Sequence, residues 1–338
     1  NTNGQIGDVS LISKRKPVVT AFNKDPLVIT EIVAEERAFD NKFDDATVNE
    51  LENLTEELLS KYEQNKNDKF IDRSNMKVIV ANDAREFIEA IGSNREIILT
   101  SKAVYDITSV LLEDFDNEKV YVRYEYNGPE LVISNVVNLI IRSESSKLAE
   151  LLVSPTYADV LNFEDSRNIF IEGVKAGHGP VRGYCDGGVF SFKRCSNIYI
   201  NNSVLYGCGT QGIELSNVEN FILDNSIIED CTYHLMTVKE SKDIVFMNSK
   251  FRNTEEFDLI EISDSQNILF DSCEISGNQT NPSYSIFGIQ NVEPKLIVKD
   301  TDIKDNIAGY LQSYKGDIYF KNITSDNNVF TKHIYKVD

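Results

Sequence analysis

The stretch that decides the fold is SNIYINNSVLYGCGTQGIELSNVENFILDNSIIEDC, which runs from residue 196 to residue 231. It contains one pattern twice, because NIYI at Asn197 returns as NFIL at Asn220 and Cys208 returns as Cys231. Each echo follows its original by 23 residues. A fixed period of this length is typical of a solenoid, in which every repeat forms one coil and stacks on its neighbours.

The same anchor, a polar residue followed by three mostly apolar ones, returns along the chain. The anchors are Asn138, Asn168, Asn197, Asn220, Asp243, Asn267, Lys295 and Asp317, with gaps of 30, 29, 23, 23, 24, 28 and 22 residues. The short gaps define a bare coil, and the longer ones contain turn residues, such as GHGP at 177–180 and NQTNP at 278–282. Because the segments are short, rich in β-branched and aromatic residues, and broken by Asn, Asp, Ser and Gly, they predict strands and not helices.

These repeats resemble a right-handed parallel β-helix of the pectin-lyase-like kind, over about Val78–Val329. They are most similar to the broad group of bacterial right-handed β-helix repeat proteins. The resemblance implies an all-β, single-stranded solenoid. The group includes lyases, hydrolases, epimerases and adhesins, so the resemblance leaves the activity open.

The chain before the repeats has a different composition. Residues 1–16 are a polar tail, and residues 17–34 hold apolar, β-branched runs that could form strands. Residues 45–65 predict a helix that packs on the side of the solenoid, capped by Asp44 or Asp45. Its apolar residues recur at helical spacing: Val48, Leu51, Leu54, Leu58, Leu59 and Tyr62.

A second, shorter helix is expected over about 83–91, where it ends at Gly92. Strands follow at 96–99 and around 104–107. A solenoid must cover the open end of its core with an atypical segment, and this helix is well placed to do so. We therefore divide the chain into residues 1–75, a tail plus packing helix, and residues 76–338, the β-helix with its cap.

Equal offsets from the anchors stack at about 4.8 Å in such a solenoid, so the sequence can be read in columns. The columns seven and five residues before the anchor are apolar and predict two inward ladders. The column between them should face solvent, because neighbouring side chains on a strand alternate faces. It contains Asn162, Ser191, Glu214, Thr237 and Glu261. Nine residues before the anchor lie Asp159, Gly188, Gln211, His234 and Asp258.

Sugar hydrolysis needs two carboxyl groups, and the columns offer candidates for them. Glu214 and Glu261 would be separated by about 9.6 Å along the backbone, twice the strand spacing, so their carboxyl groups could fall in the inverting range of about 6.5–9.5 Å. His234 and Asp258 would lie close by as proton carrier or cation ligand. Lyase chemistry would instead need charge neutralisation of a uronate, for which Ca²⁺, Arg182 or Arg252 could serve.

The turn after each anchor is the second candidate region. The inserted loop GHGPVRGYCDGG, at 177–188, is rich in glycine and functional groups, as binding loops on rigid scaffolds often are. This edge adds His178 to the catalytic candidates. The expected substrate-binding residues are Asp159, Arg182, Tyr184, Gln211, Tyr233 and Arg252. The alternative is a solvated outer face whose glycines only allow a longer loop to turn.

The five cysteines form no C-x-x-C pair, so the sequence predicts no zinc site. Cys208 and Cys231 share an offset in adjacent coils, where a disulfide or a reduced cysteine ladder would fit equally well. Cys185 lies in the glycine-rich loop, seven residues from His178, and is a candidate nucleophile. The sequence assigns no certain cofactor, and Ca²⁺ is a candidate for the lyase chemistry.

Known signatures of the fold are incomplete in this chain. Gly177-His178-Gly179 matches the G-H-G motif of polygalacturonase-type hydrolases, but the companion motifs N-T-D and R-I-K are missing. The chain has no tryptophan, so the W-x-D-H signature of pectate lyases is absent as well. The activity of neither family is therefore carried over.

The net charge of −20 argues against nucleic-acid binding, because phosphates would be repelled. No apolar run approaches the roughly 20 residues of a membrane span. The chain begins at Asn1 and not at Met, so we expect a processed, secreted or cell-surface protein, whose lipid-anchoring cysteine could have been removed.

Two functions from different classes follow. The first is a polysaccharide hydrolase or lyase that acts on a glycan along the coil face. The second is a non-catalytic adhesin, structural spacer or glycan-binding module. An enzyme should bring carboxylates together in one cleft with shifted pKa values, whereas a binding module should expose an aromatic strip or a flat face. The sequence leaves the oligomeric state open.

Overall fold

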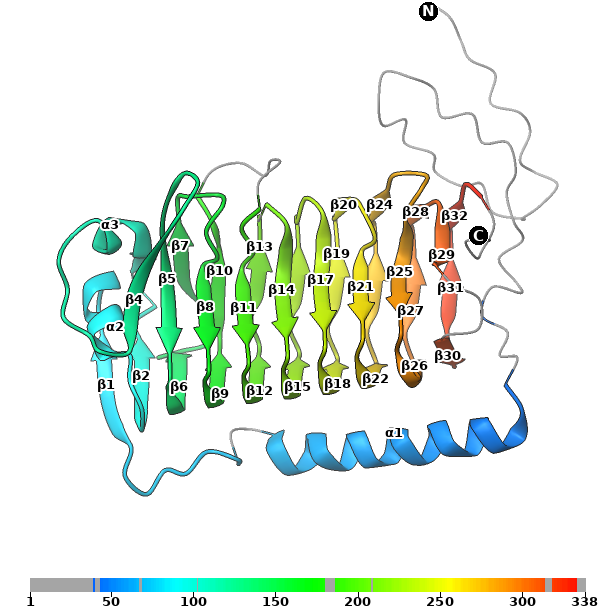
Figure 1. Ribbon diagram of the computed structural model, residues 1–338, viewed down its shortest axis with the longest axis horizontal. Coiled ribbons are helices and arrows are strands. Elements are labelled where there is room, and N and C mark those ends of the chain that lie inside the picture. The colour runs from blue at the N-terminus through cyan, green and yellow to red at the C-terminus, as the bar shows by residue number, and fades with distance from the viewer. Residues whose placement is uncertain are drawn as a thin grey trace, which may run out of the picture.

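The computed structural model describes residue 39 and residues 43–66, 69–101, 103–179, 186–207, 209–313 and 318–332. Within this part the chain winds into a stack of coils, and each coil between the two ends of the stack contributes strands to three long sheets (Figure 1). Nearly all strand pairs are parallel and join one coil to the next. The predicted all-β parallel solenoid is therefore confirmed.

Sheet A contains the anchor strands. Its strands are β1 (Lys77–Ala81), β2 (Arg95–Leu99), β6 (Val137–Ser143), β9 (Arg167–Glu172), β12 (Ser196–Asn201), β15 (Glu219–Asp224), β18 (Lys242–Met247), β22 (Gln266–Asp271), β26 (Glu293–Lys299) and β30 (Ile318–Lys321).

Sheet B follows sheet A in each coil. Its strands are β3 (Val104–Asp106), β7 (Ala149–Val153), β10 (Val174–His178), β13 (Val204–Tyr206), β16 (Ile227–Glu229), β19 (Lys250–Arg252), β23 (Glu274–Ser276), β27 (Asp302–Lys304) and β31 (Thr324–Asp326).

Sheet C closes the coil. Its strands are β4 (Val120–Glu125), β5 (Gly128–Ser134), β8 (Leu161–Glu164), β11 (Phe190–Lys193), β14 (Gln211–Ser216), β17 (His234–Lys239), β21 (Ile260–Ser263), β25 (Ser285–Gln290) and β29 (Tyr310–Gln312). A short sheet D lies between B and C in the later coils. It contains β20 (Glu255–Glu256), β24 (Gln279–Thr280), β28 (Ile307–Ala308) and β32 (Val329–Phe330).

The columns of sheet C have the predicted register. Leu161, Phe190, Ile213, Met236 and Ile260 lie opposite one another in successive strands and are all fully buried. The ladder two residues further along is buried as well. It stacks aromatic rings, with Phe163 and Phe192 parallel at a centroid distance of 5.2 Å. These two ladders supply part of a continuous apolar core along the axis.

The anchor residues form a ladder of stacked amides. The Nδ2 of Asn220 donates to the Oδ1 of Asn197 at 3.1 Å, Asn197 donates to Asn168 at 2.9 Å, and Asn267 donates to the Oδ1 of Asp243 at 2.6 Å. All these anchors have φ between 55° and 59°. Asn and Asp tolerate this left-handed conformation better than other side chains, so the anchor both turns the backbone and binds the next coil.

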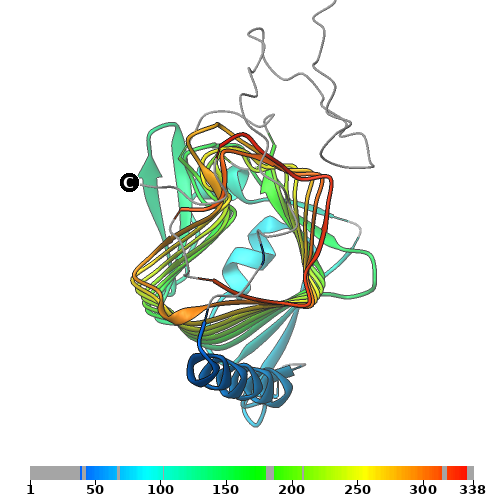
Figure 2. The same ribbon diagram turned by 90° about the vertical axis from the view of Figure 1, so that its right-hand side faces the viewer.

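Helix α1 (Asp45–Asn65) lies along the outer face of sheet A (Figure 2). Asp44 caps it by accepting the Thr47 N–H at 2.8 Å. Sheet A is apolar on this outer face too, because the middle residue of each anchor triplet points outward. Leu51, Leu58 and Tyr62 bury that row. The outward residues are Ile140, Phe170, Tyr199, Ile222, Val245, Leu269, Ile297 and Tyr319.

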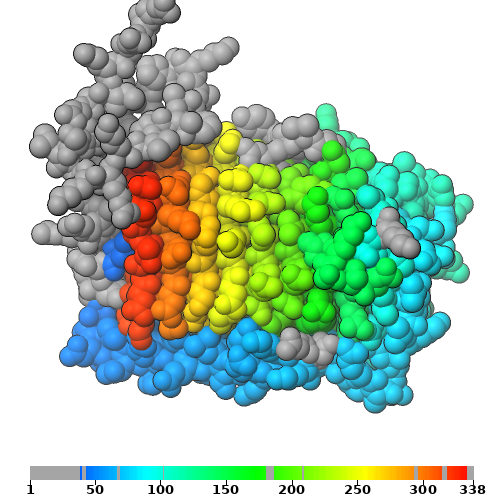
Figure 3. Space-filling model, turned by 180° about the vertical axis from the view of Figure 1, so that it is seen from behind, coloured from blue at the N-terminus to red at the C-terminus, as the bar shows by residue number. Residues whose placement is uncertain are grey.

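Both ends of the stack are covered by chain that precedes the repeats. Helix α2 (Ala84–Ala90), capped by Asp83, contributes Phe87 and Ile88 to the core at the first coil, beside α3 (Ile107–Leu111). Phe39 packs against Phe320 of the last coil with the rings at 86°. Helix α1 then runs back beneath the coils toward their first end (Figures 1 and 3). The strands predicted within residues 17–34 lie outside the described residues.

One element departs from the predicted repeat. Strands β4 and β5 form an antiparallel hairpin, and only β5 continues into the parallel stack through β8. Alternation in YVRYEY, at 121–126, followed by Asn127-Gly128, is the usual sequence signal of such a hairpin. The hairpin therefore adds β4 as an antiparallel edge strand of sheet C at its first coils.

Candidate functional site

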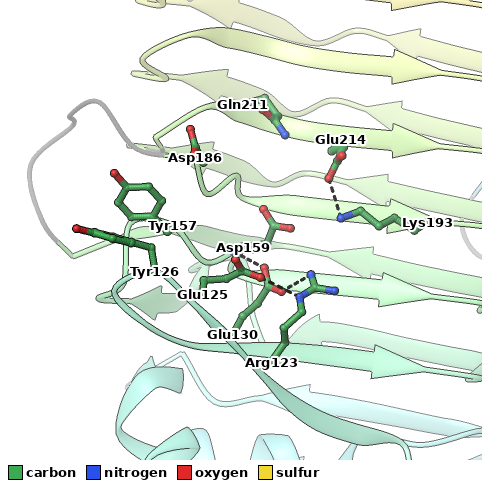
Figure 4. A pocket seen from close by; sticks show the side chains of 10 residues that line it. All are labelled: Arg123, Glu125, Tyr126, Glu130, Tyr157, Asp159, Asp186, Lys193, Gln211 and Glu214. Carbon is green, nitrogen blue, oxygen red and sulfur yellow. Dashed lines mark hydrogen bonds and ion pairs between the residues drawn. The ribbon is translucent and has the colours of Figure 1, made fainter.

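A pocket of about 450 Å³ opens where the β4–β5 hairpin meets the first coils of sheet C (Figure 4). Its lining is polar and charged, with two tyrosine rings on one side. The lining residues are Arg123, Glu125, Tyr126, Glu130, Tyr157, Asp159, Asp186, Lys193, Gln211 and Glu214.

The pocket has room because the turn before β11 contains two residues without side chains, Gly187 and Gly188. Gly188 stands between Asp159 and Gln211, and a Cβ on Gly188 would lie 3.0 Å from both the Asp159 Oδ1 and the Gln211 carbonyl oxygen. A Cβ on Gly187 would lie 2.5 Å from the Ala158 carbonyl oxygen. Side chains at either position would disturb the loop that carries Asp159. The glycines of the predicted loop thus leave room for the site.

Asp159 is the central acid of the pocket. Its side chain is 7% exposed, its Oδ1 accepts the Gly188 N–H at 2.7 Å, and its own N–H donates to the Glu130 Oε1 at 2.8 Å. Burial raises the pKa of Asp159 to about 8, and the negative charges of Glu130 and Glu214 act in the same direction. The folded protein therefore favours the protonated form of Asp159 over a wider pH range than water does.

Asn162 can accommodate that proton. It is fully buried, its Nδ2 lies 3.1 Å from the Asp159 Oδ2, and its Oδ1 has no hydrogen-bond partner within the described chain. The two ends of an amide differ only in which one donates. With the amide turned over, its oxygen accepts from the protonated Asp159 carboxyl group, so the same pair serves both charge states.

Glu214 lies two coils further along, in a different environment. Its Oε2 accepts the Ser191 hydroxyl at 2.7 Å and lies 3.3 Å from the Lys193 Nζ. Its side chain is half-buried. The pocket therefore combines a buried carboxyl group, Asp159, whose pKa is raised, with a half-buried carboxyl group, Glu214, that is bound by a serine hydroxyl and a lysine.

Arg123, on β4, organises the hairpin side of the pocket. It pairs with Glu130, with the Glu125 Oε1 at 3.0 Å and with the Glu164 Oε1 at 2.9 Å. Three carboxylates share this guanidinium, and the ion pair compensates for the burial of Glu130. The positive charge of Arg123 is therefore already balanced by residues of the protein.

Two tyrosines form one side of the pocket. The rings of Tyr126 and Tyr157 lie 5.0 Å apart at 53°, and Tyr126 is 87% exposed. Tyr121 and Tyr124 on β4 are also exposed. Exposed aromatic rings of this kind offer an apolar face and a polar tip to a ligand.

Comparison with known proteins identifies the family. The family model "Right handed beta helix region" matches residues 159–335, slightly more than half of the chain. The chain belongs to the right-handed β-helix family. A search of curated proteins finds no significant match to this β-helix protein.

Several solved structures share the course of the backbone. A pectate lyase from Paenibacillus sp. 0602 is 8% identical with a TM-score of 0.48, over 72% of this chain and 75% of that one. An alginate lyase from Paenibacillus sp. str. FPU-7 is 12% identical with a TM-score of 0.44, over 77% and 98%. The surface adhesin PfbA of Streptococcus pneumoniae is 11% identical with a TM-score of 0.33, over 88% and 90%. Similarity at this level transfers no activity.

The structure divides the predicted catalytic and substrate-binding residues of the β-helix protein into groups. Asp159, Gln211 and Glu214 line the pocket together. His234 and Glu261 form a second group further along sheet C, with the His234 Nε2 3.7 Å from the Glu261 Oε2. The His234 Nδ1 lies 2.6 Å from the Asp258 carbonyl oxygen.

Asp258, in turn, is bound to the backbone of the next coil. Its Oδ1 accepts both the N–H and the hydroxyl of Ser285, at 2.6 and 2.5 Å. The carboxylate therefore fixes a turn.

Other predicted residues lie away from the pocket lining. His178 is buried at the end of β10, with its Nε2 2.9 Å from the Ala158 carbonyl oxygen, and burial lowers its pKa. Arg252 pairs with Glu229 on sheet B, and Tyr233 packs on Phe257. These contacts give His178 and Arg252 structural partners, and the catalytic role of His178 and the binding role of Arg252 stay predictions.

Four predicted residues cannot be placed, because Arg182, Tyr184, Cys185 and Cys208 lie outside the described residues. Cys231 is buried, with its Sγ 3.7 Å from the Glu229 carbonyl oxygen. Its pairing with Cys208 stays a prediction.

The expectation that the column containing Asn162 faces solvent is wrong for its first members. Asn162 and Ser191 are fully buried, whereas Glu261 at the other end is exposed. The reason is the pocket itself, because Asp159 and Glu214 bond to these two side chains and cover them.

Sequence reasoning missed the hairpin half of the pocket. Arg123, Glu125, Tyr126 and Glu130 belong to strands outside the anchor repeat, so no column contained them. The alternating YVRYEY segment followed by Asn-Gly was the available signal. Lys193 stands on a predicted strand, four residues before an anchor and outside the two polar columns.

No group of three or more His, Cys, Asp or Glu side chains among the described residues is arranged to hold a metal ion, so these residues offer no built Ca²⁺ site. None of the described helices is long and apolar enough to cross a membrane.

Proposed function

We propose that this β-helix protein hydrolyses glycosidic bonds in the pocket, with Asp159 as the proton donor and Glu214 as the ionised carboxylate. One observation carries the proposal: a single cleft places Asp159, a buried carboxyl group whose pKa is raised, near Glu214, a half-buried carboxyl group bound by a serine hydroxyl and a lysine. Glycoside hydrolysis requires two carboxyl groups with different roles, because an acid must protonate the leaving oxygen while a carboxylate assists attack at the sugar carbon.

The cations of the pocket favour hydrolysis over elimination. A lyase must neutralise the uronate carboxylate of its substrate before a base removes the neighbouring proton. Among the described lining residues, Arg123 is shared by three carboxylates and Lys193 is paired with Glu214. Neither is available for a uronate.

The tyrosines supply a surface for the sugar ring. Tyr126 and Tyr157 flank the carboxyl groups, and sugars present C–H faces that pack on aromatic rings. A glycan substrate outside the cell would agree with the secreted or cell-surface location expected from the sequence.

Activity on a panel of glycans tests this assignment. We expect D159N and E214Q each to lose at least about 100-fold in kcat, since positioned acid–base groups contribute this much. The matched control is E274Q on sheet B, where Glu274 has the same kinds of partner as Glu214: the Ser276 hydroxyl at 2.8 Å and the Lys304 Nζ at 3.1 Å. Full activity of D159N, or equal loss in E274Q, would contradict the assignment.

Glu261 provides a second comparison. Glu214, Thr237 and Glu261 occupy one column in successive strands, so Glu261 remains the alternative partner of Glu214. If E261Q abolishes turnover while D159N does not, the pair is Glu214 with Glu261, and Asp159 has only a structural role.

The exposed tyrosines favour one rival, a glycan-binding module without turnover. Tyr124 and Tyr126 are 71% and 87% exposed on the hairpin. In that case a Y126A variant would lose glycan binding, while D159N and E214Q would bind normally and no glycan would be cleaved by the wild-type protein.

A further inference from the structure

We infer that the glycan accepted by this pocket carries positive charge, as free 2-amino sugars do, and is not a uronate. This inference rests on the proposed function, because it names the substrate class of the same site. It is carried by the balance of charged groups that line the pocket and by the way in which the cations are already paired.

The charge balance of the described lining residues is negative. With Asp159 protonated, the carboxylates of Glu125, Glu130, Asp186 and Glu214 face the cations of Arg123 and Lys193. Four carboxylates against two cations leave a formal charge of −2. A uronate would add further negative charge to this enclosed surface, whereas a protonated amine would reduce the repulsion.

The cations are held by partners that a uronate cannot easily displace. Lys193 is bound to Glu214, and Arg123 is bound to Glu130, which is only 2% exposed. Drawing Arg123 toward a ligand carboxylate would leave Glu130 as an unpaired buried charge, which costs several kcal/mol in typical cases. The arrangement therefore excludes anionic sugars as well as attracting cationic ones.

Asp186 is the carboxylate best placed to receive an amine. It is exposed, no side-chain partner for it is found within the described chain, and it lies on the side of the pocket where Tyr126 and Tyr157 stand (Figure 4). An ammonium group at this position would meet a carboxylate together with an aromatic face, and both interactions favour a cation. Asp186 is thus assigned as the residue that distinguishes amino sugars from acetylated ones.

Binding can be measured apart from turnover on the full chain carrying D159N, which mimics the protonated acid but cannot donate its proton. Isothermal titration calorimetry would compare tetramers of glucosamine, N-acetylglucosamine and galacturonic acid. We expect the glucosamine tetramer to bind most tightly and the galacturonate tetramer most weakly. Adding D186N should weaken glucosamine binding about fivefold, as loss of one exposed ion pair does, and leave N-acetylglucosamine binding unchanged.

The matched control is D264N, which removes one charge from an exposed aspartate of a later coil, held there by the Asn291 Nδ2 at 2.9 Å. It should leave all three affinities unchanged. The charge inference alone is overturned if the galacturonate tetramer binds as tightly as the glucosamine tetramer. It is also overturned if D186N weakens the binding of the glucosamine and N-acetylglucosamine tetramers equally. Binding in the expected order without cleavage by the wild-type chain overturns the proposed hydrolysis and supports the charge inference. Absence of binding by every tetramer overturns both.

Discussion

Asp159 shows how a single residue acquires a property that its type does not have in water. Burial and two neighbouring carboxyl groups oppose its ionisation, while the Gly188 N–H only partly offsets them. Because its pKa is raised in the folded protein, the protonated form contributes stability at acidic pH. That contribution is lost as pH rises from about 4 to about 8, through the folded pKa.

This linkage predicts a pH-dependent difference in stability between the wild-type protein and D159N. Asparagine cannot ionise, so the melting temperature of D159N relative to wild type should rise as pH increases from about 4 to about 8. Thermal unfolding across this pH range measures the difference. A constant difference would mean that Asp159 does not titrate there.

Glu274 supplies the control of opposite sign. Burial acts to raise its pKa, but the Ser276 hydroxyl and Lys304 outweigh burial and lower it. Its contribution is therefore present at neutral pH and is lost on acidification. E274Q should be less stable than wild type at neutral pH and should approach it in acid.

At the scale of the coil, the asparagine ladder joins two requirements in one side chain. The asparagine anchors, such as Asn197, Asn220 and Asn267, adopt positive φ, and the amide of each donates to the anchor of the coil before it. These requirements explain why the sequence repeats Asn and Asp at this position although the flanking residues vary.

Substitution of Asn220 can separate the two contributions. N220A loses the 3.1 Å hydrogen bond and also strains the backbone at φ 59°, so we expect it to cost about 2–3 kcal/mol of unfolding free energy. N220G loses only the hydrogen bond and should cost about 1 kcal/mol. Urea unfolding compares the two variants. A glycine variant less stable than the alanine variant would contradict the role given to positive φ.

At the scale of the whole molecule, the chain covers its own open ends. Helix α2 packs its apolar residues on the core at the first coil. Phe39 packs on Phe320 at the last coil, and α1 then runs along sheet A. An uncovered end would present core side chains and unpaired strand edges to other molecules.

Removing the aromatic cover should therefore promote end-to-end association. We expect F39A to form dimers or larger species as its concentration rises, as measured by sedimentation velocity, because it exposes the core beside Phe320. F43A is the control, since Phe43 packs on Tyr319 outside the barrel of coils and not at its end. Association of both variants alike would point to loosening of α1 instead.

The repeat could be predicted from the sequence because every stacked coil has the same local requirements, so the same residue types return at the same positions. Asn197 and Asn220 each need the same φ and the same amide, and the apolar residues between them alternate with the strand. Register, core columns and helix α1 followed from such periodicities. The division into residues 1–75 and 76–338 stays a proposal, since α1 buries its apolar face on the later segment.

The sequence by itself determined that like positions lie above one another, and it placed Asp159, Gln211 and Glu214 on one side of the solenoid. Only the tertiary structure decided which of the many acids share a pocket. The β4–β5 hairpin lies outside the period and brings Arg123, Glu130 and Tyr126 against the coils by long-range pairing. Charge states such as that of Asp159 depend on this burial and on those neighbours, which periodicity does not encode.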